Sequence, residues 1–202
     1  MNPADEPSAP LIGVLALQGD FAAHRVVLER LGAEVREVRV PADLTGLQGL
    51  VMPGGESTTM TLGIAREGLG DPLRAFAATG APIFGTCAGL IMLDREHLGI
   101  MDTVAERNAF GRQIRSFEED LDLAPLVPGD PVRAVFIRAP WIAEHGDDVE
   151  ILAAVDGHPV AARQGGCLVI SFHPELSGDD RLHAAFVTSV REHAERLERP
   201  AA

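Results

Sequence analysis

Short apolar runs alternate with stretches of helical periodicity through the first half of this 202-residue chain. Each apolar run is bounded by glycine, proline or charged residues, which is typical of strands inside a sheet. We predict strands at residues 11–17, 34–40, 49–52 and 82–84. The helical spacing predicts helices at residues 21–31, 57–66, 71–79 and 90–97. Alternating strands and helices predict a parallel sheet with crossover helices.

The second half of the chain has closely spaced strands with short turns. Further strands are predicted at residues 132–137, 150–155, 159–163 and 167–172. Asp156-Gly157 and Gln164-Gly165-Gly166 have the composition of hairpin turns. These strands therefore add an antiparallel part to the sheet.

The end of the chain has the pattern of one long amphipathic helix at residues 179–197, with Ser177 and Asp180 as a capping box. We see no internal repeat and no linker. The sequence therefore predicts a single α/β domain at residues 11–202, preceded by a disordered tail at residues 1–10. Its expected architecture is a mostly parallel central sheet flanked by helices, with extra antiparallel strands from the second half.

The formal net charge of −13 argues against a nucleic-acid ligand, because phosphate contacts need clustered lysine and arginine. It argues equally against anionic membrane surfaces, and no apolar run is long enough to span a bilayer. The N-terminal segment lacks the basic start and apolar core of a signal peptide. Two cysteines do not indicate a disulfide scaffold, and we expect Cys167 in the core. We therefore expect a cytoplasmic protein.

Cys87 lies between a predicted strand and a predicted helix, in the run Gly85-Thr86-Cys87-Ala88-Gly89. Glycines two residues to either side have the spacing of a nucleophile elbow, with cysteine in place of serine. A side chain at either glycine would collide with the neighbouring strand or helix. The helix N-terminus favours the reactive thiolate through its unpaired N–H groups and partial positive charge. The pattern by itself also fits a packed core thiol in a glycine-rich turn.

A catalytic thiol needs a histidine base, and the histidine needs an acceptor that fixes its tautomer. His173 closes an apolar run and is followed by Pro174 and Glu175. In extended backbone, which Pro174 favours, His173 and Glu175 point to the same side. The end of a strand is also the layer of the sheet in which the Cys87 turn is expected. The other six histidines have charged or turn-like neighbours and are predicted to be exposed: His24, His97, His145, His158, His183 and His193.

A cysteine at a strand–helix elbow, with His-Pro-Glu late in the chain after another strand, resembles the class I glutamine amidotransferases. The resemblance implies that Cys87 is the nucleophile and that His173 is the base and acid. It implies that Glu175 orients His173. It also implies the fold of these enzymes.

Glutamine has an α-carboxylate and an α-ammonium group that a pocket must bind. Arginine suits the carboxylate, which makes Arg107 and Arg138 candidates. Glu56, in the run Pro-Gly-Gly-Glu-Ser-Thr-Thr, is a candidate for the ammonium group. Each of these charges also fits an ordinary surface position.

Six runs in one order resemble, more narrowly, the glutaminase subunits of pyridoxal 5′-phosphate synthase. They are L-x-x-Q-G-D, P-G-G-E-S-T-T, F-G-T-C-A-G-L, E-R-N-x-F-G-R-Q, F-I-R-A-P and S-F-H-P-E-L. The resemblance implies an oxyanion hole made by the N–H groups of Gly55 and Ala88. The residues that it implies bind glutamine are Gly55, Glu56, Ser57, Arg107, Ile137 and Arg138. It also implies a (β/α)₈-barrel synthase partner that receives ammonia, and no metal or organic cofactor for the glutaminase.

Two departures and three alternatives accompany this interpretation. Residues 94–99 form a shorter segment than is usual in that family, and the tail at residues 1–10 has no expected role. One alternative is a class I glutaminase that feeds a different acceptor synthase, which the triad cannot separate. The second is a thiol sensor or chaperone-like protein of similar fold, which would not need the His-Pro-Glu partner. The third, a pure binding module, is disfavoured by a complete triad.

Overall fold

The computed structural model describes residues 9–107, 116–124 and 126–199. Its centre is a seven-stranded sheet in the order β2-β1-β3-β4-β11-β10-β9. The strands are β1 (Leu11–Leu15), β2 (Glu34–Val38), β3 (Gly49–Met52), β4 (Ile83–Thr86), β9 (Glu150–Val155), β10 (His158–Gln164) and β11 (Cys167–Ile170). Neighbours from β2 to β11 pair parallel, and β10 and β9 extend the sheet by antiparallel pairing. The predicted fold class is confirmed.

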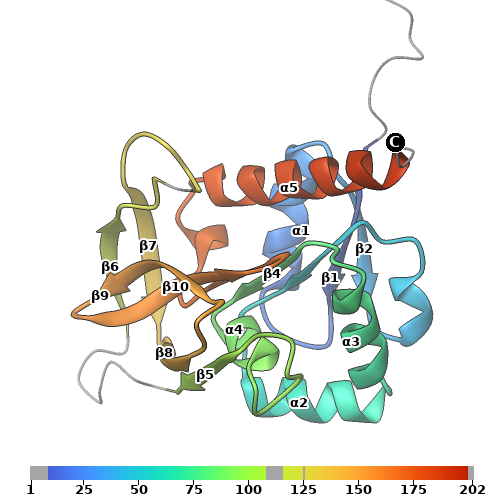
Figure 1. The fold of residues 1–202 in the computed structure, drawn as a ribbon, viewed down its shortest axis with the longest axis horizontal. Coiled ribbons are helices and arrows are strands. Elements are labelled where there is room, and N and C mark those ends of the chain that lie inside the picture. Colours follow the sequence, from blue (N-terminus) through green and yellow to red (C-terminus); the bar gives the residue numbers. More distant parts are fainter. Residues whose placement is uncertain (1–8, 108–115, 125, 200–202) are drawn as a thin grey trace, which may run out of the picture.

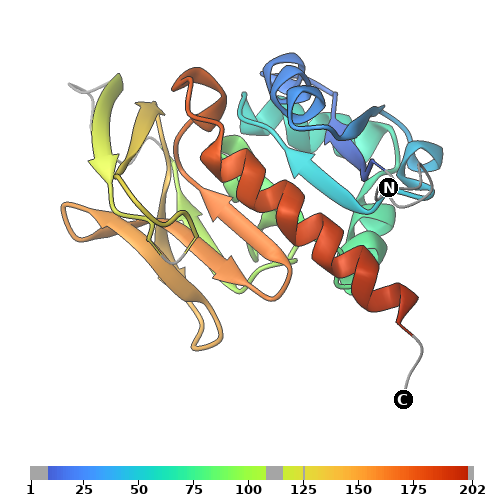
Figure 2. The same ribbon diagram turned by 90° about the horizontal axis from the view of Figure 1, so that it is seen from above.

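Helices cover both faces of this sheet. They are α1 (Phe21–Arg30), α2 (Ser57–Arg66), α3 (Gly70–Ala78), α4 (Ala88–Leu93) and α5 (Arg181–Glu198). Figure 1 shows α1 and α5 on one face and α2, α3 and α4 on the other. Figure 2 shows α5 crossing its face diagonally. Alternating strand residues supply two apolar cores, with Val14 and Phe84 facing the first pair of helices and Leu15 and Ile83 facing the others.

Two small antiparallel sheets lie beside the central sheet. Strand β5 (Thr103–Glu106) pairs with β8 (Trp141–His145), and β6 (Ser116–Leu121) pairs with β7 (Val132–Ile137). Sequence reasoning predicts β7 but misses β5, β6 and β8. These strands are short, and half of the residues of β6 are charged and exposed, so no apolar periodicity marks them.

The hairpin turns are confirmed, whereas two other local predictions are wrong. Asp156 and Gly157 have φ of 50° and 81°, as a two-residue hairpin loop of type I′ requires. The helix predicted at residues 90–97 ends at Leu93. The capping box is absent, because Asp180 makes no side-chain cap and the hydroxyl of Ser177 donates to the Pro174 carbonyl instead.

Residues 1–8 of the predicted tail lie outside the described residues, so the domain limits stay a prediction. Most of the Glu-Arg-Asn run, residues 108–113, lies outside them as well. In the part of the chain that the structure describes, no helix combines the length and the apolar character needed to cross a bilayer.

Candidate active site

Cys87 stands at the junction of β4 and α4, at the carboxyl end of a parallel strand. Its backbone has φ 48° and ψ −105°, a conformation that costs a non-glycine residue about 1–3 kcal/mol. The N–H of Cys87 donates to the carbonyl of Ile170 over 2.9 Å, which ties the turn to β11. The side chain is largely buried but lines a pocket. The strained turn therefore fixes the direction of the thiol at the edge of the sheet.

The two glycines of the elbow are required by close packing, as predicted. A Cβ on Gly89 would lie 1.9 Å from the carbonyl oxygen of Met52, which is backbone in β3. A Cβ on Gly85 would lie 2.9 Å from Cδ1 of Leu93 and 3.0 Å from the Gly89 carbonyl oxygen. Since a strand inside the sheet cannot retreat without losing hydrogen bonds, the elbow excludes a side chain at Gly89.

His173 and Glu175 make the expected contact, although through a different backbone. The chain after β11 enters a 3₁₀ helix, η2 (Pro174–Leu176), and does not stay extended through Glu175. Nδ1 of His173 lies 2.7 Å from Oε1 of Glu175. Because β4 and β11 are neighbouring parallel strands, Cys87 and His173 reach the same edge of the sheet, where both side chains lie next to Gly54 and line one cavity. Cysteine, histidine and glutamate are therefore in contact in that order.

The electrostatics of His173 favour its protonated form. Burial lowers the pKa of His173, but hydrogen bonds with Cys87 and Glu175 outweigh burial and raise that pKa to about 10. The side chain of Glu175 is fully buried behind the histidine. The other cysteine behaves differently, because burial alone raises the pKa of Cys167 to about 11 and its side chain belongs to the apolar core. The arrangement therefore favours a cationic His173 beside Cys87.

Three histidines predicted to be exposed are buried: His24, His183 and His193. Nδ1 of His24 lies 2.9 Å from Nε2 of His183, and Nε2 of His24 lies 3.3 Å from Oε2 of Glu175. The charged neighbours of His24 along the sequence mask its burial. A signal was nevertheless present, since Val27 and Leu28 follow His24 by three and four residues and share its buried helix face.

The glycine loop after β3 lies directly over the Cys87–His173 pair. A Cβ on Gly54 would be 2.5 Å from Cε1 of His173 and 3.3 Å from Cβ of Cys87. Gln18 holds this loop, because its Oε1 accepts from the N–H of Glu56 and its Nε2 donates to the Glu56 carbonyl, each over 3.1 Å. Sequence reasoning misses the role of Gln18, although its Gln-Gly-Asp run marks the end of a strand.

The loop and the elbow open onto a cavity of about 290 Å³, near the lower end of the range for small-molecule sites. The residues that line it are Asp20, Gly55, Glu56, Ser57, Cys87, Ala88, Ile91, Arg107, Ile137, Arg138, Pro140 and His173. All six residues predicted to bind glutamine and both predicted oxyanion residues are among them. Ala88 is the first residue of α4, so its N–H has no acceptor within the helix.

Glu56 is an ionised carboxylate at the rim of this cavity. Hydrogen bonds from the Thr59 hydroxyl and from the N–H groups of Thr58 and Thr59 lower its pKa to about 2. Both carboxylate oxygens thus cap the N-terminus of α2. The negative charge predicted to face an ammonium group is therefore present and fixed in place.

Arg107 follows β5 and is held from two sides. Its Nη1 donates to the hydroxyl of Thr58 over 3.3 Å, and its Nη2 donates to Nε2 of His97 over 3.0 Å. His97 must then carry its proton on Nδ1, which lies 2.7 Å from Oδ1 of the buried Asp94.

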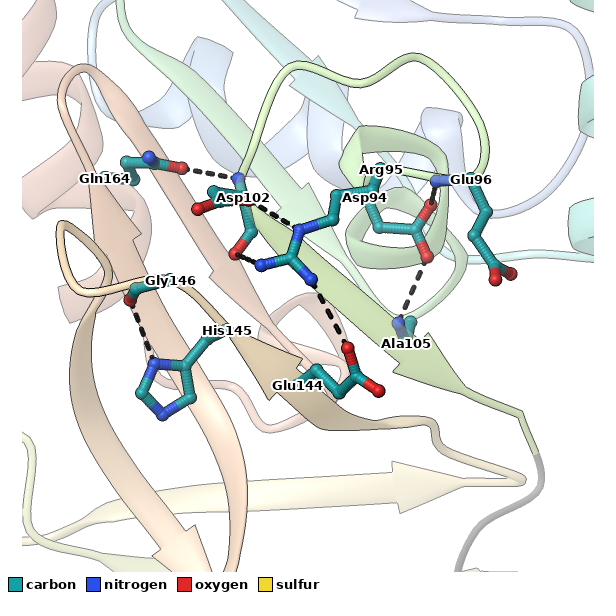
Figure 3. A network of polar contacts seen from close by, with 9 residues as sticks. All are labelled: Asp94, Arg95, Glu96, Asp102, Ala105, Glu144, His145, Gly146 and Gln164. Atoms are coloured by element: carbon teal, nitrogen blue, oxygen red, sulfur yellow. Dashed lines mark hydrogen bonds and ion pairs between the residues drawn. The ribbon is translucent and has the colours of Figure 1, made fainter.

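Asp94 anchors the α4–β5 connection that leads to Arg107. Figure 3 shows its carboxylate between the backbone N–H groups of Glu96 and Ala105, at 2.9 and 3.1 Å. In the same view Arg95 reaches Asp102 and Glu144, which links this connection to β8. Polar contacts therefore hold the short segment at residues 94–99 in place.

Arg138 follows β7 directly and also lines the cavity. Its φ is 45°. In the described chain, three non-glycine residues have a positive φ: Cys87, Arg138 and Asp156. Two of these three strained residues line the cavity, as is common at functional sites.

Asp20 is a further residue that sequence reasoning misses. Its Oδ2 lies 3.8 Å from Nδ1 of His173, and Asp20, His173 and Glu175 bring one ligand atom each within 4.8 Å of one another. The His173–Glu175 contact within this group is already a short hydrogen bond, and Glu175 is inaccessible to solvent. The group therefore fits a catalytic pair better than a metal centre.

A cysteine next to a histidine that is hydrogen-bonded to a buried carboxylate is typical of enzymes that cleave acyl bonds through a covalent thioester. Comparison with known proteins narrows this class. The model of the SNO glutamine amidotransferase family matches residues 14–192, and the chain belongs to this family.

Named relatives and solved structures are consistent with that membership. Pyridoxal 5′-phosphate synthase subunit PdxT of Streptomyces avermitilis is 50 % identical over 193 residues, which covers 91 % of this chain and 96 % of that protein. The protein of the same name from Frankia alni is 51 % identical with the same coverage. A crystal structure described as a glutamine amidotransferase is similar with a TM-score of 0.82 and 46 % identity, covering 89 % of this chain and 98 % of that one. The structure of PurLQS from Thermotoga maritima, at 19 % identity and a TM-score of 0.71 over 92 % and 99 % of the chains, shares the fold.

Proposed function

We propose that this chain hydrolyses L-glutamine to L-glutamate and ammonia and delivers the ammonia to a synthase subunit that makes pyridoxal 5′-phosphate. The observation that carries the proposal is the contact chain from Cys87 through His173 to Glu175 at the edge of a small polar cavity. The name of the relatives at about half identity supports the acceptor. We further propose a (β/α)₈-barrel partner and a cytoplasmic location, with which the free thiols of Cys87 and Cys167 are consistent.

The proposed reaction has two halves. The thiolate of Cys87 attacks the side-chain amide carbon of glutamine, and the carbonyl oxygen becomes an oxyanion that N–H groups of Gly55 and Ala88 stabilise. His173, as imidazolium, protonates the amide nitrogen, the C–N bond breaks, and ammonia leaves a glutamyl thioester. Neutral His173 then takes a proton from water while the water oxygen attacks the thioester. Collapse of this second intermediate releases glutamate and restores the thiolate–imidazolium pair.

The same proposal assigns the rest of the cavity to the amino-acid end of the substrate. Arg107 and Arg138 offer guanidinium groups to the α-carboxylate, and Glu56 offers a carboxylate to the α-ammonium group. Ser57 and Ile137 complete the lining next to these charges. A cavity lined by both a carboxylate and guanidinium groups favours a zwitterion over a neutral amide.

Ammonia release from glutamine, measured with and without the candidate synthase, tests the proposal. We expect Cys87→Ala to abolish glutamate release while its circular dichroism spectrum stays that of the wild type. Cys167→Ala is the matched control, because it removes a thiol from the core, and we expect it to remain active. Appreciable hydrolysis by Cys87→Ala would contradict the assignment of Cys87 as the nucleophile. Hydrolysis without any binding to the synthase would instead support a different acceptor.

We also expect the partner to stimulate hydrolysis. Gly54 and Gly55 can move because they carry no side chain, and the Gly54 carbonyl now accepts a hydrogen bond from the N–H of Asp20 over 3.3 Å. Docking that rearranges this loop would complete the oxyanion hole. A free chain that already works at the full rate would contradict this expectation.

A further inference from the structure

Glu175 has one carboxylate oxygen whose environment the triad does not explain. Oε1 accepts from His173 over 2.7 Å, while Oε2 is buried and makes no hydrogen bond of regular geometry to the described residues. Nε2 of His24 lies 3.3 Å from this oxygen. A buried carboxylate oxygen needs a donor, because leaving it unpaired is costly.

His24 is placed to be that donor. It lies in the middle of α1 with no exposed surface, and it does not line the substrate cavity. Its Nε2 lies between Oε2 of Glu175 and the hydroxyl of Thr86, at 3.3 and 3.2 Å. Its Nδ1 lies 2.9 Å from Nε2 of His183 on α5.

Burial favours the neutral form of both of these histidines. Burial, with the neighbouring His183 and His173, lowers the pKa of His24 well below its usual range. Burial also lowers the pKa of His183 to about 4. Each ring therefore carries one N–H, and the hydrogen bond between the two rings uses one of them.

The neighbours decide which nitrogen of His24 carries the proton. If His24 were protonated on Nδ1, the lone pair of Nε2 would face the anionic oxygen of Glu175 at 3.3 Å, which is repulsive. With the proton on Nε2, His24 donates toward Glu175 and its Nδ1 accepts from Nε2 of His183. The remaining Nδ1 of His183, which has no partner in the described chain, is then an unprotonated nitrogen, so neither ring N–H of the two histidines is left without an acceptor.

We propose that His24 is a positioning residue for the reaction, whose neutral ring donates from Nε2 to Glu175 and so holds the carboxylate against His173, with His183 fixing the tautomer of His24. Glu175 then accepts a hydrogen bond at each carboxylate oxygen, so its carboxylate cannot rotate away from His173. The inference rests on the proposed function for its effect on turnover, but the contact itself does not depend on the substrate.

The tautomer is tested on the wild-type chain. Nitrogen-15 NMR of the ring nitrogens, assigned by comparison with His24→Gln, should show His24 protonated on Nε2 alone throughout about pH 5–9, whereas an exposed histidine titrates near pH 6.5. Protonation on Nδ1, or a second proton within that range, would overturn the proposal. This result stands even if the chain does not hydrolyse glutamine, in which case the proposed function fails separately.

Kinetics with the synthase present test the consequence. His24→Leu removes the donor and should lower kcat by about 10–100-fold, as loss of a supporting hydrogen bond behind an active-site group does, with KM within about twofold. His24→Gln keeps an N–H donor of similar reach and should recover most of that loss. His193→Leu is the control, a buried histidine on α5 that does not contact Glu175.

Alkylation separates positioning from a general structural effect. In a Cys167→Ala background, iodoacetamide reports the thiolate of Cys87, and loosening of Glu175 in His24→Leu should move the pH profile of the alkylation rate upward. An unchanged profile together with wild-type kcat in His24→Leu would refute the proposal. Equal losses of kcat in His24→Gln and His24→Leu would refute it too, because the donor would then not be the cause.

Discussion

The two sides of the cavity are built differently. Cys87 follows β4, His173 and Glu175 follow β11, and the side chains of all three are buried. The N–H of Cys87 donates to Ile170 of β11 in the central sheet, and the N–H of His173 donates to Val135 of β7. Arg107 and Arg138 follow short strands of the two-stranded sheets and are exposed. Bond-breaking chemistry needs groups held within a fraction of an ångström, which a buried parallel sheet provides. Charges that bind the substrate can be carried by exposed loops, so changes on the first side should alter kcat and changes on the second should alter KM.

Among variants that keep Cys87, the largest effect on the buried side is expected from Glu175→Gln, which keeps the shape of the side chain and removes its charge. The amide can place its NH₂ against Nδ1 of His173 and select the wrong tautomer, so we expect kcat to fall on the order of 10³–10⁴-fold with little change in KM. Steady-state ammonia release with the synthase measures both constants. Glu150→Gln, an exposed carboxylate paired with Arg163, is the control. A rise in KM without a fall in kcat would contradict the expectation that changes on the buried side alter kcat.

Gly54→Ala should be next. Its Cβ would overlap the ring of His173, so the loop or the ring must shift, and a displacement of about 1 Å costs on the order of 100-fold in kcat. Gly70→Ala is the matched control, because a Cβ there meets only the end of the flexible Arg74 side chain. Rates and melting temperatures of both variants separate the two effects. Wild-type turnover by Gly54→Ala would show that the loop does not lie over the reacting groups in solution.

Arg107→Ala tests the exposed side. Losing one charge-assisted hydrogen bond to a carboxylate should raise KM for glutamine about 10–100-fold and leave kcat within a few-fold. Arg163→Ala removes a guanidinium away from the cavity and should leave both constants unchanged. If kcat fell while KM stayed constant, Arg107 would belong functionally to the buried side.

His97→Leu should have a smaller effect of the same kind, a rise in KM of about three- to tenfold, because Arg107 keeps its contact with Thr58. The control is His145→Leu, an exposed histidine of β8 whose ring contacts only its neighbour's carbonyl among the hydrogen bonds of the described chain. The double variant with Arg107→Ala should be no worse than Arg107→Ala alone, since both changes remove one interaction. Additive losses would mean that His97 acts independently.

The smallest effect concerns pH and the cap of α2. The folded-state pKa of Glu56 is depressed to about 2, so its contribution to stability is present above the unfolded value of 4.5 and is lost as pH falls toward 2. Glu56→Gln should lower the melting temperature slightly at pH 7, and the difference from wild type should vanish near pH 2. Glu67→Gln, at the other end of α2, is the control. A difference that persisted at pH 2 would place the effect elsewhere than in the charge.

Local patterns predicted the elements that carry strong periodicity and failed where periodicity is absent. The limits of β3, α2, β7 and β9 coincide with the predicted runs, because glycine, proline or charged residues lie at or next to their ends. Strand β5 is polar and short, and it exists through pairing such as that of Thr103 with His145, far along the chain. The exposure of His24 was predicted from its neighbours in sequence, yet its burial depends on His183, 159 residues away.

The sequence by itself determined the alternation of strands and helices, the glycine-flanked elbow at Cys87 and the His-Pro-Glu run, since each depends on residue type at short spacing. Only the tertiary structure decided that β3, β4 and β11 are neighbours, so that the glycine loop, Cys87 and His173 meet at one edge of the sheet. It also decided that Gln18 holds the glycine loop and that His24 faces Glu175. Burial and hydrogen-bond partners depend on the packing of distant segments, which local spacing does not record.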